Sequence, residues 1–401
     1  MRRHHGSLPR KGLRVAAAVI AGSSMVLLGS GLNAAPAAGA TTTSVNVACA
    51  NVYGPGGLIQ AINTANRSSR PSTISLAANC TYPLTVARPA LCCSLRDSDG
   101  LPAVTAEVTI LGHGTPTRPG ATIARSLAAG SHTIRIIEVG PSGNLTLRGL
   151  NILGGLNYLG GGIYNNMGGQ LALDHSNLIQ NHSINANDSG AGGAGGGLTN
   201  AGTASFTNRS TVANNTSEAT MNDSSASGGG IENFGDLVMA DSAVTDNRVT
   251  ALSTSIGIAE GGGIFNSGTM VLANTPVTGN TVETDTNGPF PTGLAAGGGI
   301  ANDQFQSAST ARLDHSPVTG NSVAAPGGGD ARGGGIDVLN GAVSINNGAI
   351  NGNDADPRGA ATAAGGGIYL TAGTVTLNQT RVTNNKPDNC EPTGAVPGCT
   401  A

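Results

Sequence analysis

Two stretches of the chain carry the residue types of a hydrolytic triad, since residues 174–176 and residues 314–316 both read Asp-His-Ser. A nucleophilic hydroxyl, an imidazole base and an orienting carboxylate work together only when their side chains converge on one point. Both stretches lie in segments that we expect to be extended, where consecutive side chains point to opposite faces. We therefore do not interpret either stretch as a catalytic triad.

Paired carboxylates are the second chemistry to consider, because a glycoside hydrolase needs two of them roughly 5 to 10 Å apart. Close pairs occur at Glu283 with Asp285 and at Asp354 with Asp356, in segments of variable sequence, and we interpret them as solvated loop charges. A calcium-dependent lyase would need several carboxylates that converge beside a basic residue. The sequence shows no such cluster, so it predicts no catalytic residue, no metal site and no cofactor.

The elements that position these residues follow from a repeat of two phrases. The first phrase is a glycine triplet followed by Ile or Leu, and its seven copies begin 32 to 36 residues apart. The second phrase is a small residue, an aliphatic residue two positions later and an Asn three positions after that. The triplets begin at Gly160, Gly195, Gly228, Gly261, Gly297, Gly333 and Gly365. The repeated asparagines are Asn181, Asn215, Asn247, Asn280, Asn321, Asn353 and Asn385.

Self-similarity at this period indicates a solenoid, in which each repeat buries its apolar face against its neighbours. Apolar residues recur at spacing two in short runs, such as Leu171 with Leu173, and no repeat shows helical spacing. Three short strands in each repeat, stacked coil on coil, predict an all-β fold, a parallel β-helix. We expect about ten coils over residues 73–387, three of them irregular and the last seven regular.

The repeated Gly and Asn have structural interpretations. Glycine enters positive φ without steric cost, so each triplet is expected to form a tight corner. Stacked asparagines can bond through their amides to the coils above and below, so we expect a structural ladder along one corner. A binding site would occur once, whereas these residues occur in every regular coil.

A single helix is expected before the repeats. Residues 57–65 place Leu58, Ile59, Ile62 and Ala65 on one helical face. This apolar stripe is suited to covering the open end of the β-helix. Residues 41–72 are therefore predicted to form an N-terminal cap.

Aligned coils allow a search for a carboxylate pair. The position after each triplet's Ile or Leu is expected to face outward, and it carries Glu232 and Asp337. These acids are three coils apart, about 14 Å, which is too far for a hydrolytic pair. The irregular coils cannot be aligned, so a catalytic site there stays an open alternative. Their charged residues are Glu107, Arg135, Glu138 and Arg148.

The N-terminal segment, residues 1–40, has the features of a secretory signal peptide. Five basic residues accompany the apolar run of residues 15–32, and residues 38–40 read Ala-Gly-Ala. We expect cleavage after Ala40, a secreted, extracellular protein and no integral membrane segment in the mature chain. Without this segment, 15 basic and 23 acidic residues give a net charge of −8. A chain with this charge lacks the excess of basic residues that binds nucleic acid, so we expect no nucleic-acid partner.

The six cysteines all lie outside the regular repeats, and in a secreted chain they predict disulfides at the two ends of the solenoid. They are Cys49, Cys80, Cys92, Cys93, Cys390 and Cys399. Cys390 with Cys399 is the expected pair of the tail, residues 388–401. The four N-terminal cysteines allow three connectivities, of which Cys49 with Cys80 is our first choice.

The two phrases together resemble the repeat of the polymorphic outer membrane proteins, whose second phrase usually carries Phe where this chain has Leu, Val or Ile. The segment before them resembles the leading part of bacterial secreted β-helix proteins of the pectin-lyase-like superfamily. The residues that carry this second resemblance are Cys49, 57–62, 65–66, 74–76, 80–82, 100–102 and 108–110. The resemblances span residues 49–385 and imply a right-handed β-helix and an extracellular location. Only 16 residues follow Asn385, so the translocating barrel of the outer-membrane family is not expected.

Function is expected to reside in the surface. Between each ladder Asn and the next triplet lie variable segments such as 182–194, 281–296 and 322–332, which we expect to form a ridge of loops. Variation stacked on one face is where solenoids bind. We expect a non-catalytic, monomeric protein that contacts a glycan or a cell-surface partner. The alternative is an extracellular polysaccharide lyase or glycoside hydrolase, because the resembled fold hosts both classes.

Overall fold

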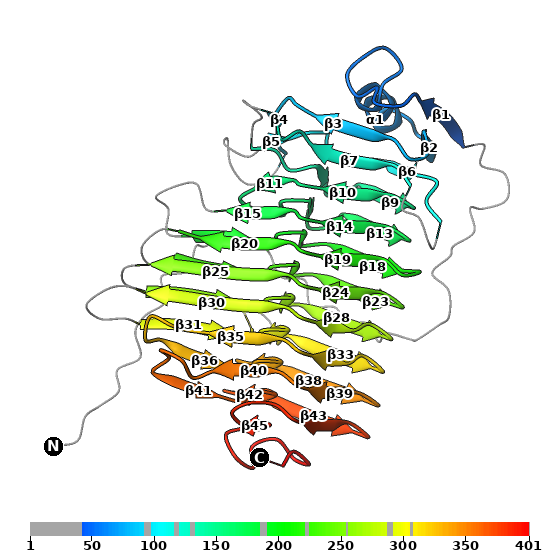
Figure 1. Ribbon diagram of the computed structural model, residues 1–401. Helices are drawn as coiled ribbons and strands as arrows, with labels where there is room; N and C mark the ends of the chain where they lie inside the picture. Colours follow the sequence, from blue (N-terminus) through cyan, green and yellow to red (C-terminus); the bar gives the residue numbers. More distant parts are fainter. Residues whose placement is uncertain are drawn as a thin grey trace. The chain divides into compact units, whose positions relative to one another are not determined.

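The computed structural model describes residues 42–91, 98–115, 120–128, 133–184, 191–220, 224–253, 256–286, 292–304 and 308–400. The predicted signal peptide and the residues Cys92 and Cys93 lie outside these ranges. Residues 41–401 form one compact unit, an all-β parallel solenoid of about nine turns, close to the ten expected (Figure 1).

Three sheets surround the main core of the solenoid, and the strands within each sheet are parallel (Figure 1). The first sheet contains β1 (Thr43–Val47), β2 (Ser72–Leu76), β6 (Glu107–Leu111), β9 (Asn144–Arg148), β13 (Gln170–Asp174), β18 (Thr203–Thr207), β23 (Asp236–Ala240), β28 (Thr269–Ala273), β33 (Thr310–Asp314), β38 (Ala342–Asn346) and β43 (Thr374–Asn378). The second contains β3 (Thr81–Leu84), β7 (Thr122–Arg125), β10 (Asn151–Leu153), β14 (Asn177–Ile179), β19 (Thr211–Ala213), β24 (Ala243–Thr245), β29 (Val277–Thr278), β34 (Val318–Thr319), β39 (Ala349–Asn351) and β44 (Arg381–Thr383). The third, which follows the glycine triplets, contains β8 (Ile137–Val139), β12 (Ile163–Asn165), β17 (Leu198–Asn200), β22 (Ile231–Asn233), β27 (Ile264–Asn266), β32 (Ile300–Asn302), β37 (Ile336–Val338), β42 (Ile368–Leu370) and β45 (Cys390–Glu391).

The segments expected to be a ridge of loops form two further sheets, so that expectation was wrong for most of their length. The fourth sheet contains β11 (Leu156–Asn157), β15 (His182–Ile184), β20 (Thr216–Ala219), β25 (Arg248–Ser253), β30 (Thr281–Thr286), β35 (Ser322–Ala324) and β40 (Asp354–Asp356). The fifth contains β16 (Ala191–Ala194), β21 (Ser224–Ser227), β26 (Ile256–Glu260), β31 (Thr292–Ala296), β36 (Asp330–Arg332) and β41 (Thr362–Ala364). We call these two sheets the outer lobe. A small antiparallel pair, β4 (Arg88–Pro89) and β5 (Ser98–Asp99), completes the sheets.

The outer lobe has a core of its own, and small side chains explain why the sequence concealed it. Its buried residues are mainly alanines, such as Ala226, Ala259 and Ala295, with a few valines such as Val249. Alanine alternating with Gly and Ser gives little contrast in hydropathy, so the period of two that marks a strand is weak. Small side chains also let two sheets pack closely, which accounts for strands in segments that composition alone would leave as loops.

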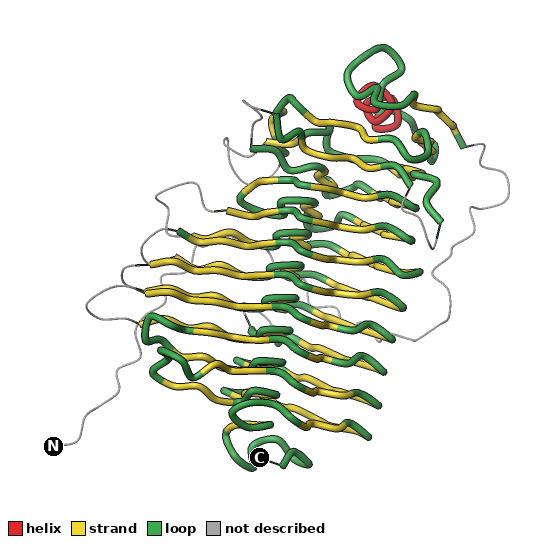
Figure 2. Tube along the Cα trace, viewed as in Figure 1, coloured by secondary structure: helices red, strands yellow, loops and turns green. Residues whose placement is uncertain are grey.

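The helix α1 (Leu58–Asn66) covers the N-terminal end of the main core (Figure 2). It buries Leu58, Ile59, Ile62 and Ala65, the stripe that the sequence predicted. The first sheet begins earlier than the boundary drawn at residue 73, because β1 pairs with β2 in parallel register. A disulfide joins Cys49 and Cys80 just after β1, and a second joins Cys390 and Cys399 at the other end.

Each glycine of a triplet has its own steric requirement, as the third copy shows. Gly228 has a φ of +59°, and a Cβ there would lie 2.4 Å from the carbonyl oxygen of Ile231. A Cβ on Gly229 or Gly230 would lie 2.4 or 2.7 Å from a carbonyl oxygen of the triplet in the next coil. The triplet therefore combines one positive φ with two close approaches of stacked backbones.

The seven repeated asparagines form a continuous buried ladder. Asn247 is representative: its backbone N–H and its Nδ2 both donate to Oδ1 of Asn280, at 3.0 and 2.9 Å. Its Nδ2 also donates to the carbonyl of Val212 at 3.0 Å. The same geometry recurs from Asn181 to Asn385, so each amide satisfies backbone groups that the corner would otherwise leave unpaired.

Candidate functional site

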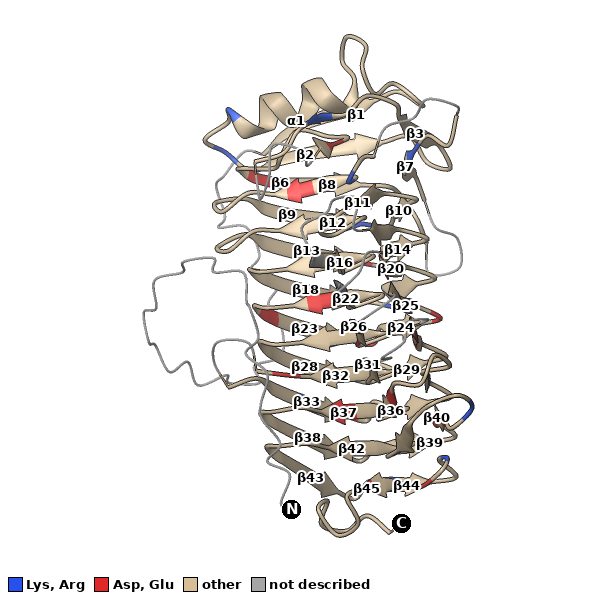
Figure 3. Ribbon diagram, turned by 90° about the vertical axis from the view of Figure 1, so that its left-hand side faces the viewer, with Lys and Arg blue, Asp and Glu red and all other residues tan. Residues whose placement is uncertain are grey.

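The position after each triplet's Ile or Leu was expected to face outward, and the structure corrects this. Glu232 is only 4% exposed and Asp337 is 0% exposed. Both lie on the third sheet, on the face covered by the outer lobe, where Ser227 of β21 donates to Glu232 Oε1 at 2.6 Å. The outer lobe that the sequence concealed is the reason that these acids are buried. Figure 3 shows the acidic segments of β8, β22 and β37 along this sheet.

Burial alters the protonation of both acids. It raises the pKa of Glu232 to about 8, against hydrogen bonds from Ser227 and Thr199 that lower it. Burial raises the pKa of Asp337 well above its usual value, and the nearby charge of Glu260 adds to this effect. Neither carboxyl can reach a polymeric substrate, because neither is open to solvent.

Two of the four charged residues that the sequence left open, Arg135 and Glu138, belong to a buried structural cluster, whereas Glu107 and Arg148 are exposed on β6 and β9. Arg135 and Glu138 are both fully buried. Arg135 Nη1 lies 3.1 Å from Asp99 Oδ1 and 3.8 Å from Glu138 Oε2, and its guanidinium lies 5.0 Å from the ring of Tyr164. Glu138 Oε2 also accepts a hydrogen bond from the Leu91 N–H at 2.7 Å. The cluster joins three segments of the irregular coils and has no open side for a substrate.

The two acid pairs were expected to lie in loops, but both lie on strands. Glu283 lies on β30 and forms an ion pair with Arg248. Asp354 and Asp356 lie on β40, and hydrogen bonds from Arg358 lower the pKa of Asp356. Among the described residues, no group of three or more His, Cys, Asp or Glu side chains could hold a metal ion.

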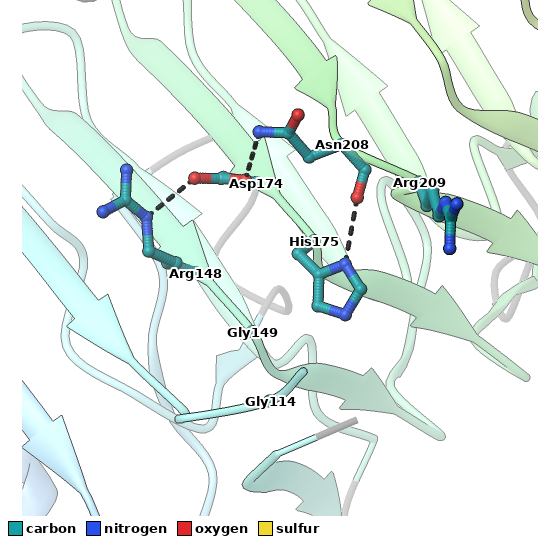
Figure 4. Close-up of a pocket in the computed structure, with 7 residues that line it drawn as sticks. All are labelled: Gly114, Arg148, Gly149, Asp174, His175, Asn208 and Arg209. Atoms are coloured by element: carbon teal, nitrogen blue, oxygen red, sulfur yellow. Dashed lines mark hydrogen bonds and ion pairs between the residues drawn. The ribbon is translucent and has the colours of Figure 1, made fainter. Parts of the chain in front are cut away.

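A hollow of the described surface combines two arginines, an aspartate, a histidine and an asparagine, and we call it the corner hollow. It has a volume of about 490 Å³ and lies at the corner between the first and second sheets (Figure 4). It is lined by Gly114, Arg148, Gly149, Asp174, His175, Asn208 and Arg209. Two glycines among these seven leave room where other corners carry side chains.

The carboxylate of Asp174, which lines the corner hollow, is held by two donors. Arg148 Nε donates to Asp174 Oδ2 at 2.7 Å, and Asn208 Nδ2 donates to Asp174 Oδ1 at 2.7 Å (Figure 4). Each carboxylate oxygen therefore has one protein donor and a remaining lone pair. The arrangement presents a guanidinium, a carboxylate and an amide in fixed positions, which is suited to hydrogen bonding with a polar ligand.

The imidazole of His175 is held against backbone carbonyls. Its Nδ1 lies 3.0 Å from the carbonyl oxygen of Asn208, and its Nε2 contacts the carbonyl oxygen of Thr115. Ser176, the third residue of the Asp-His-Ser stretch, is 0% exposed and donates its hydroxyl to the carbonyl of Leu147 at 3.0 Å. The stretch is therefore no triad, because its serine lies inside the solenoid and its histidine does not face that serine.

An extra residue at one corner was missed in the sequence. Alignment on the small residue of the second phrase placed Asn208 level with Asp174, but the structure pairs Asp174 with Thr207. Asn208 is thus an insertion, and both it and Arg209 take left-handed conformations, with φ of +55° and +65°. The signal was present as a gap one residue longer between Phe206 and the next small residue than in the preceding coil.

The corner hollow is locally positive in an acidic chain. Asp174 compensates Arg148, whereas Arg209 is exposed and its guanidinium has no ion pair with any residue that the structure describes. Only one carboxylate lines the hollow, and two donors hold it, so a hydrolytic pair is missing. The geometry supports binding of a ligand with acidic or hydroxyl groups and gives no support to acid–base catalysis.

The fold and the hollow define a parallel β-solenoid with a polar surface site. Comparison of the chain with protein-family models, with curated proteins and with solved structures finds no match. Within the described ranges, none of the helical structure is long and apolar enough to cross a membrane.

Proposed function

We propose that this protein is a secreted, non-catalytic β-solenoid that binds glycans at the corner hollow. The single observation that carries the proposal is the fixed Arg148, Asp174 and Asn208 group beside the exposed guanidinium of Arg209. Sugar hydroxyls both donate and accept, so they match a set of side chains that offers both functions in fixed geometry. Arg209 would favour an acidic group on the glycan, such as a carboxylate or a sulfate.

Several features support an extracellular role. One disulfide cross-links the chain near each end of the solenoid, and disulfides persist in oxidising compartments. The N-terminal segment has the pattern of a signal peptide. The resemblance to pectin-lyase-like β-helix proteins and to the repeats of polymorphic outer membrane proteins agrees with this location. That resemblance supports the architecture more than the activity, because a fold of this kind hosts many functions.

The proposal is tested with the mature chain, residues 41–401, and a panel of uronate-containing, sulfated and neutral polysaccharides. Retention on immobilised polysaccharide and cleavage of the chains are both scored. We expect retention of an acidic polysaccharide without cleavage, and retention at least tenfold weaker for Arg209→Ala. Arg381→Ala is the matched control, since this exposed arginine lies on β44, away from the hollow.

Cleavage of any polysaccharide would favour the lyase or hydrolase alternative. Absence of retention across the panel would overturn the glycan-binding proposal. Equal retention of the Arg209 and Arg381 variants would move the binding site away from the corner hollow.

A further inference from the structure

The corner that holds Asp174 carries the same arrangement of side chains a second time, around Asp314. Arg312 Nε donates to Asp314 Oδ2 at 2.8 Å, and Asn346 Nδ2 donates to Asp314 Oδ1 at 2.7 Å. The corresponding distances around Asp174 are both 2.7 Å. Each carboxylate is thus held by one guanidinium and one amide, on the same oxygens.

The residue after each aspartate is also the same. His175 and His315 both have left-handed backbones, with φ of +52° and +48°. Both therefore project from the corner in the same way, beside the carboxylate that precedes them. The serines that follow, Ser176 and Ser316, are buried in both copies, so the surface presents Arg, Asp, Asn and His each time.

The two arrangements are assembled from different positions of the coil. Arg148 is the register partner of Asp174 in the preceding coil, whereas Arg312 lies two residues before Asp314 on β33 itself. The amide donor of the first copy is the inserted corner residue, whereas Asn346 is the register partner of Asp314 in the next coil. Because the donors come from different positions, simple copying of the repeat does not account for the shared arrangement.

The spacing of the two copies is set by the sheet. Asp174 ends β13 and Asp314 ends β33, which is four strands further along the first sheet. At about 4.8 Å for each step, the two carboxylates are about 19 Å apart along the solenoid axis. The three strands between them end in Thr207, Ala240 and Ala273, so no large side chain of this column stands between the copies. The left-handed corner residues that follow these strands include Arg209, Asp241 and Asn274, and Asn274 Nδ2 donates to Asp241 Oδ1 at 3.1 Å.

The surroundings of the copies differ in the residue after the amide donor, which is Arg209 in the first copy and Asn347 in the second, and in the wall beside the histidine. The first is walled by the segment at Gly114 and Thr115, which contacts His175 and makes the corner hollow. His315 is exposed, and no wall of this kind is described beside it. The second copy therefore offers a shallower contact, which would bind weakly by itself.

We infer that the Arg312, Asp314 and His315 group is a second glycan subsite, and that the ligand is a linear acidic glycan lying along this corner across both subsites. This inference rests on the proposed function. A chain that reaches both subsites makes the second contact intramolecularly, so its affinity exceeds that of a short oligomer. A short oligomer can occupy only the corner hollow.

The test uses size-fractionated oligomers of whichever acidic polysaccharide the mature protein retains, measured by calorimetry. We expect a rise of at least tenfold in affinity once the oligomer spans the two subsites, a step that the range of avidity gains permits. In a variant carrying Arg312→Ala and His315→Ala, this step should disappear while the affinity for short oligomers stays unchanged. Arg381→Ala again serves as the control, and thermal melting checks that each variant is folded.

The outcomes separate the two proposals. Affinity that does not depend on length, or a length step that survives in the double variant, would overturn the second subsite and leave the glycan-binding proposal standing. Loss of affinity for short and long oligomers alike in the double variant would also overturn it, because the primary contact would then lie at Asp314. Absence of binding by any oligomer or polysaccharide would overturn both.

Discussion

Asn389 accepts from Asn385 the two hydrogen bonds that every other ladder asparagine gives to the asparagine of the next coil, although only four residues separate Asn385 and Asn389. The backbone N–H and Nδ2 of Asn385 donate to Asn389 Oδ1 at 3.3 and 3.0 Å. The preceding step, from Asn353 to Asn385, has the same two bonds at 2.9 Å each, but there the partners are one coil apart. The tail after the last regular coil therefore folds back to imitate the next coil.

A hydrogen bond and a disulfide hold the folded-back tail in place. Asn389 Nδ2 donates to the carbonyl of Thr400 at 3.0 Å, and the disulfide from Cys390 to Cys399 closes the segment between them. Cys390 pairs in register with Ile368, in the position that an Ile of a further coil would occupy. The tail thus satisfies the last amide of the ladder and extends the third sheet beyond the last regular coil.

Replacement of Asn389 by Ala should destabilise this end of the solenoid. The amide of Asn385, which is 7% exposed, would lose its acceptor. An unsatisfied buried donor lowers the free energy of unfolding by about 1 to 3 kcal/mol. Urea denaturation followed by circular dichroism measures the change. Asn46→Ala, an exposed asparagine on β1, is the control and should leave the unfolding midpoint in place.

Replacement of Asn280 by Ala in the middle of the ladder should have a larger effect. Its Oδ1 accepts two bonds from Asn247, and its Nδ2 donates to Asn321 Oδ1 and to the carbonyl of Val244. The variant leaves donors and acceptors unpaired on both neighbouring coils, so we expect a loss of at least about 3 kcal/mol. The same urea titration compares it with the Asn389 variant, and an equal or smaller loss would contradict the ladder as a continuous stabilising element.

The main solenoid could be predicted because its requirements recur in every coil. Gly229 must be glycine since a carbonyl of the next coil lies where its Cβ would be, and Asn247 must bond to the next Asn. Requirements of this kind appear in the sequence as strict repetition. The capping helix was predicted from its apolar stripe, which contrasts clearly with its polar face.

The rest could not be predicted because its signal is weak or local. Ala259 and Ala295 build the core of the outer lobe with almost no contrast in hydropathy. Without that lobe, Glu232 was expected to face solvent. The corner hollow depends on Asn208, a single inserted residue. Aligning the coils on the following serine hides this insertion, because it places Asn208 level with Asp174 in place of Thr207. The repeated residues therefore allowed the coils to be predicted, whereas the candidate site is formed by residues that depart from the repeat.

The core of the outer lobe should not accept a larger side chain. Ala295 is 0% exposed on β31, between other alanines of this core. Ala295→Leu adds volume where the sheets are close, and overpacking of this kind lowers stability by about 1 to 3 kcal/mol. Thermal unfolding measures the loss against Ala342→Leu, an exposed alanine of β38. If the two variants unfold at the same temperature, the outer lobe is not closely packed.

Glu232 should make the stability of the protein depend on pH. In the unfolded chain this carboxyl ionises with the ordinary glutamate pKa of 4.5, whereas burial keeps it protonated in the folded chain up to about pH 8. Between these values the folded state holds a proton that the unfolded state has lost. Raising the pH therefore favours unfolding: the stabilisation is complete below about pH 4.5 and is lost as the pH approaches about 8.

The variant Glu232→Gln keeps the shape of the side chain but cannot ionise. Its stability should therefore lack the fall between about pH 4.5 and about pH 8 that the titration of Glu232 causes. We expect it to match the original protein near pH 4 and to exceed it by roughly 3 to 5 kcal/mol at pH 9, since one pKa unit corresponds to about 1.4 kcal/mol. Urea titrations at a series of pH values measure the difference. Asp236→Asn, an exposed acid at the start of β23, should show no such divergence, and a Glu232 variant that follows the original protein at every pH would mean that this carboxyl is already ionised in the folded state.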